Sequence, residues 1–192
     1  MKEMLRAHIE KLVELSDEEY SFVRSHFTIR NFQKGSFMIE KGNPVRNAYL
    51  IISGLTKLVY HNADLREHII SFAMEDWWET DYPAWFMGGT ATLNLQCMED
   101  TQAYSLSLED FRIICAKVQK MEHFFLEKAN RGHVASMERI LSFLAATPRE
   151  RYELLLKKQP ALMQRVPKAM LAAYLGVSRE TLSRLWRSPR QR

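Results

Sequence analysis

The strongest constraint on the fold is a change of hydrophobic period along the chain. Between residues 28 and 108 the apolar runs are short, and turn-forming residues separate them. They read TIRNF, SFMIE, AYLIIS, LTKLVY, HIISFA, TATLNLQC and QAYSLSL. Short, regularly punctuated runs of this kind are typical of strands and predict a β-roll or jelly roll. We expect AYLIIS and LTKLVY to form a hairpin around Ser53-Gly54.

Helical periodicity lies on both sides of this region. Residues 2–15 have apolar positions at helical spacing, and Ser16 with Glu19 fits a capping box for a second helix. After Leu108, LSLEDFRIICAKV predicts a helix with Ser107 as its cap. A longer helix is expected over residues 121–146, and RERYELLLKKQPALMQRV predicts further short helices. The chain is therefore expected to have an α+β fold.

The long helix carries an apolar stripe at alternating spacings of three and four residues, formed by Val134, Met137, Leu141 and Leu144. This spacing resembles a short coiled coil and predicts a dimerisation helix. The alternative is a helix that packs on its own sandwich, and the stripe alone does not decide between the two.

The basic charge is concentrated at the C-terminal end. The formal net charge is +4, and residues 165–192 hold seven Lys or Arg against Glu180, which makes that segment +6 and the other 164 residues −2. Such asymmetry predicts a nucleic-acid or anionic-membrane partner for this segment, with a solvated basic terminus as the alternative.

The same segment contains the most specific motif, PKAMLAAYLGVSRETLSRLWR, at residues 167–187. Pro167 can open a helix, Gly176 can end it in the left-handed conformation, and Ser178 can cap a second helix. Ala172 is small enough to let two helices cross closely. The pattern predicts a helix-turn-helix.

Base and phosphate contacts are assigned to the second helix and to the start of the first. Arginine matches the acceptors of guanine, a carboxylate accepts from cytosine, and the other cations suit phosphates. A helical hairpin with a solvated face is the alternative. The predicted DNA-binding residues are Lys168, Ser178, Arg179, Glu180, Thr181, Ser183, Arg184 and Arg187.

LGVSRETLSR closely resembles the recognition segment of the Crp/Fnr superfamily of transcriptional regulators, in which an Arg-Glu-x-x-x-Arg pattern reads the half-site. FQKGSFMIEKGNPVRNAYLIISGLTKLVY resembles the cyclic-nucleotide-binding β-roll of that family, and the chain is similar to its short Bacteroidetes-type members. The resemblance implies a sensor domain at 1–112, a dimerisation helix region at 113–146 and a DNA-binding domain at 147–192. It further implies a homodimer on double-stranded DNA, with RNA polymerase as a candidate partner.

The sequence departs from family members that bind cyclic nucleotides. They carry a Gly-Glu pair and a later Arg in a cassette that matches residues 75–96 here. No Lys or Arg lies between Arg66 and Arg112, where nine Asp and Glu residues occur. Because a cyclic phosphate needs a cation or an array of N–H donors, we expect no cyclic AMP binding by the family mode.

Aromatic side chains in the cassette region allow two interpretations. Trp77, Trp78, Tyr82 and Trp85 could line a pocket for an apolar effector, or they could be core and lid packing, which is the favoured interpretation. The effector is thus unknown or absent. Because the sequence stops five residues after Arg187, we expect a truncated β-wing.

The runner-up is a cupin-type jelly-roll enzyme acting on a metal or small molecule, with an accessory helical domain. His61, Glu67 and His68 do not have the cupin spacing, and no catalytic or metal-binding motif occurs. We therefore expect no enzyme activity, no cofactor and no metal. No signal peptide or membrane-spanning run is apparent, so the cytoplasm is the expected compartment and no membrane partner is expected.

Overall fold

The computed structural model describes residues 3–64 and 66–187, with side chains up to residue 185. It has two compact units, Met1–Ala129 and Asn130–Arg192, which meet within one long helix. The helices are α1 Met4–Ile9, α2 Asp17–Ser25, α3 Tyr82–Met87, α4 Leu108–Lys117, α5 Gln119–Ala145, α6 Pro148–Lys158, α7 Pro160–Arg165, α8 Lys168–Leu175 and α9 Arg179–Arg187. The strands are β1 Thr28–Phe32, β2 Phe37–Ile39, β3 Asn47–Ser53, β4 Thr56–His61, β5 Glu67–Ala73, β6 Trp78–Glu79, β7 Asn94–Cys97 and β8 Thr101–Ser107.

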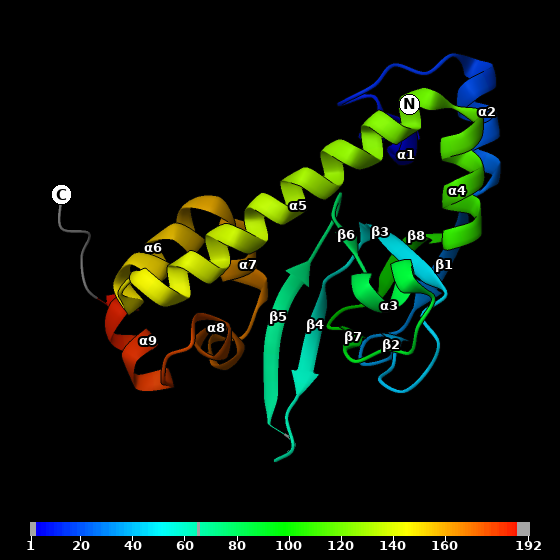
Figure 1. The fold of residues 1–192 in the computed structure, drawn as a ribbon. Coiled ribbons are helices and arrows are strands. Elements are labelled where there is room, and N and C mark those ends of the chain that lie inside the picture. Colours follow the sequence, from blue (N-terminus) through cyan, green and yellow to red (C-terminus); the bar gives the residue numbers. More distant parts are fainter. Residues whose placement is uncertain (1–2, 65, 188–192) are drawn as a thin grey trace. The chain divides into compact units, whose positions relative to one another are not determined.

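The strands of the first unit form two antiparallel four-stranded sheets (Figure 1). One sheet has the order β1-β8-β3-β6 and the other β2-β7-β4-β5. The predicted α+β class with an N-terminal β-sheet domain and a long helix is therefore confirmed. The predicted boundaries after residues 112 and 146 separate regions by function, and they stay a prediction. The boundary between the two compact units lies between Ala129 and Asn130.

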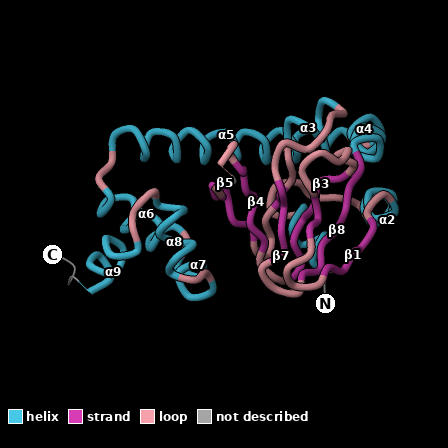
Figure 2. Tube along the Cα trace, turned by 90° about the horizontal axis from the view of Figure 1, so that it is seen from below, coloured by secondary structure: helices cyan, strands magenta, loops and turns pink. Residues whose placement is uncertain are grey.

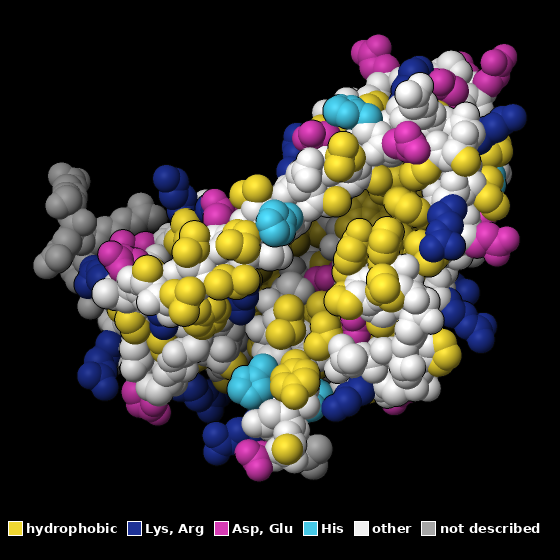
Figure 3. All heavy atoms as spheres, viewed as in Figure 1, with side chains coloured by type: hydrophobic (Ala, Val, Ile, Leu, Met, Phe, Trp, Pro, Cys, Tyr) yellow, Lys and Arg dark blue, Asp and Glu magenta, His cyan; other side chains and the backbone are white. Residues whose placement is uncertain are grey.

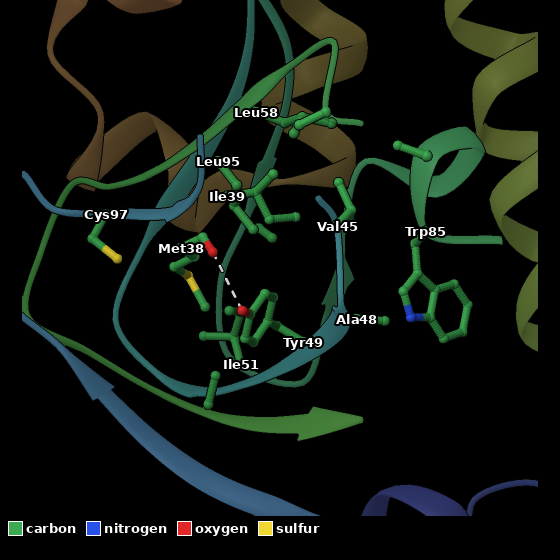
Figure 4. Packing of buried hydrophobic residues seen from close by; sticks show 14 residues of the cluster. Met38, Ile39, Val45, Ala48, Tyr49, Ile51, Leu58, Trp85, Leu95 and Cys97 are labelled. Carbon is green, nitrogen blue, oxygen red and sulfur yellow. Dashed lines mark hydrogen bonds between the residues drawn. The ribbon is translucent and has the colours of Figure 1, made fainter. Parts of the chain in front are cut away.

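The first sheet is buried on both faces because its central strands alternate their side chains between two cores. Ile51 and Ala103 belong to a core with residues of β2, β4 and β7 (Figure 4). Leu50 and Leu106 face the other way and pack with residues of α1, α2, α4 and the start of α5. Figures 1 and 2 show α2 and α4 beside β1 and β8. This second core fastens the first turns of α5 to the sheet.

Two predicted helix starts are confirmed by their caps. The Ser16 side chain accepts from the backbone N–H of Glu19, whose carboxylate accepts in turn from the N–H of Ser16. Ser107 accepts from the N–H of Asp110 and starts α4. The expected helix over residues 2–15 was wrong in length, since α1 ends at Ile9. The chain turns after it, and Leu15 is buried against the second core.

The predicted hairpin around Ser53-Gly54 was wrong. β3 pairs with β6 and β8, whereas β4 pairs with β5 and β7, so the chain crosses from one sheet to the other at Gly54. Gly54 has φ +107°, and its N–H donates to Glu75 Oε1 at 2.9 Å. A single sequence stretch with a turn signal does not distinguish a hairpin from such a crossover.

Two elements of the cassette region were missed. The short strand β6 and the helix α3 lie between the predicted strands HIISFA and TATLNLQC. The second of these is strand only at Asn94–Cys97. Asp81 caps α3 and Gly88, at φ +70°, ends it. The six-residue helix is too short to give a helical period in the sequence.

The second unit contains the end of α5 and helices α6 to α9. Its buried apolar side chains come from four helices and the loop after α7: Leu155, Leu162, Met163, Val166, Leu171, Ala172, Leu175 and Leu182. Thr147 forms a capping box with Glu150 at the start of α6. None of the described helices is long and apolar enough to cross a membrane.

Gly54→Ala is expected to destabilise the first unit by about 2–4 kcal/mol, because it combines a strained positive φ with a steric clash. The added Cβ would lie 2.5 Å from Thr101 Oγ1 and 2.7 Å from Asp100 O. Urea unfolding of the full chain measures the effect. Gly42→Ala is the matched control, because Gly42 has φ +91° and open space around the added Cβ. Equal losses in the two variants would contradict the crowding at the crossover.

Candidate functional site

The predicted helix-turn-helix segment folds as two helices around a glycine turn. α8 ends at Gly176, which has φ +66° and donates its N–H to Ala172 O and Ala173 O. Ser178 Oγ accepts from the N–H of Thr181 at 3.1 Å and so caps α9. Leu182 is buried against α8, and Ala172 is buried at the crossing as expected. The local sequence signals for this turn are therefore confirmed.

The predicted DNA-binding residues divide by exposure. Ser178, Arg179, Glu180, Arg184 and Lys168 are exposed. Thr181 and Ser183 are half-buried, and the hydroxyls of Ser178 and Thr181 lie 3.1 Å apart within the cap. The side chain of Arg187 lies outside the described residues.

The exposed surface of α9 carries side chains of both charge signs, namely Glu180 and the arginines Arg179 and Arg184. Hydrogen bonds from its own backbone N–H and from the Ser178 hydroxyl lower the pKa of Glu180, with smaller contributions from Arg179 and Arg184. The carboxylate is thus ionised at neutral pH and lies on the same helix surface as two guanidinium groups. This surface can offer both acceptors and donors to base edges in a major groove.

The predicted apolar stripe on α5 is exposed. Its four side chains have fractional exposures between 43% for Met137 and 79% for Leu144. Ile140 is also exposed, and hydrophobic side chains gather over the second half of α5 (Figure 3). Exposed apolar surface of this extent is typical of an interface.

In the cassette region, residues 75–96, the side-chain carboxylate of Asp81 accepts several hydrogen bonds from the backbone. Asp81 is fully buried, and its Oδ2 accepts from Thr92 N at 2.8 Å, Leu93 N at 3.0 Å and Thr92 Oγ1 at 3.1 Å. Its Oδ1 accepts from Ala84 N at 3.4 Å, at the start of α3. The N–H donors of this stretch therefore converge on a carboxylate that belongs to the chain.

A second acid lies two residues before Asp81. Burial raises the pKa of Glu79 to about 7, although Ser71 Oγ donates to it at 2.5 Å and Thr80 N at 3.2 Å. Glu79 pairs with Tyr49 across β6 and β3. A phosphate placed in this stretch would meet the charge of Asp81 and, above neutral pH, that of Glu79 as well.

The four aromatic candidates for an effector pocket occupy different surroundings. Trp78 packs against both cores, and its Nε1 donates to His8 Nε2 at 3.0 Å. Trp77 packs against the core between the sheets, and Trp85 is buried in that core with no hydrogen-bond partner for Nε1 among the described residues. Tyr82 is exposed and stacks on Phe86. This arrangement supports the interpretation as core and lid packing.

A surface pocket of the first unit contains none of these four side chains. It is lined by Asn31, Phe32, Gln33, Ser53, Asp100, Thr101 and Gln102. Within the part of the chain that the structure describes, no group of three or more His, Cys, Asp or Glu side chains could hold a metal ion.

Three side chains that hold the end of α8 were missed in the sequence. Arg139 and Phe143 of α5 and Arg151 of α6 surround Tyr174, Leu175 and Gly176. Arg139 and Phe143 lie on the side of α5 away from the apolar stripe. Their spacing of four residues, on a face of α5 other than that of the stripe, is the sequence signal that could have identified Arg139 and Phe143.

Residues 29–118 match the model of the cyclic nucleotide-binding domain. The match covers β1 to β8, α3 and α4, and with it the Asp81 cluster. No protein of curated function matches the chain.

Solved structures similar to the chain are Crp/Fnr-type transcription regulators. The catabolite activator protein of Thermus thermophilus is 25% identical with a TM-score of 0.56, over 90% of this chain and 82% of that one. The c-di-GMP-responsive regulator CLP of Xanthomonas campestris is 16% identical with a TM-score of 0.69, over 88% and 89% of the two chains. FixK2 of Bradyrhizobium japonicum is 18% identical with a TM-score of 0.69, over 83% and 82%. The resemblance stated from the sequence is confirmed, and the cupin-type alternative is not favoured.

Proposed function

We propose that this protein is a homodimeric, sequence-specific DNA-binding transcriptional regulator without an enzymatic role. The observation that carries the proposal is the exposed surface of α9, which begins at the Ser178 cap after the glycine turn and holds Arg179, Glu180 and Arg184. The Crp/Fnr-type fold supports it, because the similarity to the catabolite activator protein of Thermus thermophilus extends over 90% of this chain. In the proposed complex α9 enters the major groove and Lys168 contacts a phosphate.

Arg184→Ala is expected to weaken binding to the preferred duplex by about 1–3 kcal/mol and to relax selectivity at one base pair, because a bidentate contact to guanine is lost. Selection from randomised duplexes, followed by fluorescence anisotropy on the selected site, measures both effects.

Lys168→Ala is the matched control for this substitution. Loss of a phosphate contact should weaken all sequences alike and reduce the slope of log affinity against log salt by about 1. An unchanged base preference in Arg184→Ala would show that the readout assignment is wrong. A wild-type chain that binds no duplex at low ionic strength would contradict the proposed function itself.

The dimer is assigned to α5. Val134, Met137, Leu141 and Leu144 lie at coiled-coil spacing and are exposed in the single chain, so a second copy of the helix would bury them. Two-fold symmetry would then place two recognition helices on half-sites about 34 Å apart. The exposure of the stripe within its own unit supports this assignment.

Leu141→Asp is expected to convert the dimer to a monomer at micromolar concentration, because it buries a charge in the apolar seam. Sedimentation velocity measures the change in mass. Ser136→Asp places the same charge at an exposed position of α5 outside the stripe and should stay dimeric. A dimer that persists in Leu141→Asp would move the interface elsewhere.

The regulator is proposed not to respond to cyclic AMP by the family mode. Asp81 occupies the converging N–H donors of the matching stretch, and Glu79 is a second acid two residues earlier in the chain. Bringing a phosphate within about 4–6 Å of an uncompensated carboxylate costs on the order of kilocalories per mole. An unknown effector, or none, remains compatible with this stretch.

Calorimetric titration of the wild-type protein with cyclic AMP and with cyclic GMP is expected to give no binding at micromolar concentration, since both carry the anionic phosphate that the carboxylates oppose. A regulator known to bind cyclic AMP serves as the positive control. A micromolar dissociation constant for either nucleotide would overturn the expectation.

A further inference from the structure

The end of α8 has two backbone carbonyls that need partners from outside the helix. The last carbonyls of a helix have no intrahelical donor. At the turn, the N–H of Gly176 donates to Ala173 O, and the N–H of Val177 donates to Ala172 O. The next two carbonyls along the chain, those of Tyr174 and Leu175, accept neither of these hydrogen bonds. How these two carbonyls are satisfied decides how firmly the turn before α9 is held.

Two arginines from neighbouring helices supply the donors. Arg139 Nη2 of α5 donates to Tyr174 O at 3.2 Å, and Arg151 Nε of α6 donates to Leu175 O at 3.0 Å. Arg151 Nη1 also donates to Ala146 O, just after the end of α5, at 2.7 Å. A guanidinium has several donors in a fixed plane, so a single Arg151 links the ends of α5 and α8.

Aromatic rings hold both guanidinium groups in place. The Cζ of Arg139 lies 3.8 Å from the centre of the Tyr174 ring and 4.9 Å from that of Phe143. The Cζ of Arg151 lies 5.2 Å from the centre of the Phe143 ring. Burial lowers the pKa of Arg139, as expected for a cation held among rings. These contacts have geometric requirements that a lysine ammonium does not fulfil.

The Phe143 ring also lies against the turn itself. A Cβ at Gly176 would be 2.8 Å from Phe143 Cε1, so the ring packs directly over the glycine between α8 and α9. The cluster of Arg139, Phe143, Arg151 and Tyr174 therefore lies against the left-handed glycine of the turn that leads into α9. All four residues belong to the second unit.

We propose that Arg139 and Arg151 are positioning residues for DNA binding, which clamp the end of α8 to α5 and α6 and thereby fix the direction of the recognition helix. The inference rests on the proposed function. It assigns these two cations to orientation within the basic unit, whereas Lys168 and Arg184 are assigned to the DNA. Because Arg139 lies on α5 opposite the apolar stripe, the clamp ties the spacing of the two recognition helices to the dimer helix.

The experiment uses Arg139→Lys and Arg151→Lys in the full-length chain, with duplexes that carry two copies of the selected half-site at varied separation. The wild type should prefer one separation. Each variant should bind that duplex about tenfold more weakly and should discriminate less between separations, because a hydrogen bond and a ring contact are lost while the charge is kept. The half-site sequence and the salt slope should stay unchanged, since no base or phosphate contact is removed.

Arg149→Lys is the matched control, because Arg149 lies on α6 and pairs with Glu153 of the same helix at 3.1 Å. It should keep the wild-type affinity and spacing preference. Circular dichroism reports whether the variants fold. Should a Lys variant lose helix content, Phe143→Leu keeps both arginines and is expected to give the same loss of spacing preference.

Three outcomes would overturn the inference. Lysine variants with wild-type affinity and spacing preference would show that the clamp does not orient α9. A salt slope reduced by about 1 in Arg139→Gln or Arg151→Gln, which remove the charge that lysine keeps, would show a phosphate contact instead. Folded Phe143→Leu with an unchanged spacing preference would exclude the ring. If the wild type binds no duplex at all, the proposed function fails, which is a different result.

Discussion

The fold of the first unit depends on the alternation of side chains along β3 and β8. Neighbouring residues such as Leu50 and Ile51 point into different cores, so one sheet supports the roll on one face and the helices on the other. A shift of one residue in register would exchange both sets of side chains. The start of α5 is held by the second core, and the exposed apolar stripe and the contact of Arg139 with Tyr174 lie further along the same helix.

Much of this architecture could be predicted from the sequence because its signals are local. Capping at Ser16 and Ser107, the left-handed Gly176 and the cap at Ser178 each depend on residues within one turn, and each is confirmed. Strand pairing is not local, and the predicted hairpin at Ser53-Gly54 was wrong for that reason. Only the partners of β3 and β4 across the chain show that Gly54 joins two sheets.

In the candidate site too, the features that depend on neighbouring residues could be predicted, and the contacts between distant residues could not. Exposure of Arg179, Glu180 and Arg184 follows from helical spacing within one short segment, and the structure has them exposed. The contacts of Arg139 and Arg151 with α8 join positions 35 and 24 residues apart in the chain. The basic composition of residues 165–192 suggested phosphate contacts for that segment alone, and no sequence signal distinguished Arg139 and Arg151, which lie against rings, from cations on the surface. That distinction needs the arrangement in space.

The carboxylate of Asp81 is attached to the domain whose donors it occupies. A diffusible ligand leaves when its concentration in the cell falls, whereas a tethered one is present at all times. At the donors that Asp81 occupies, the domain therefore has no empty form to return to when a metabolite is withdrawn. For the proposed regulator, if it has no other effector, control of transcription would then depend on what sets the amount of the proposed dimer, namely synthesis, degradation and self-association of the chain.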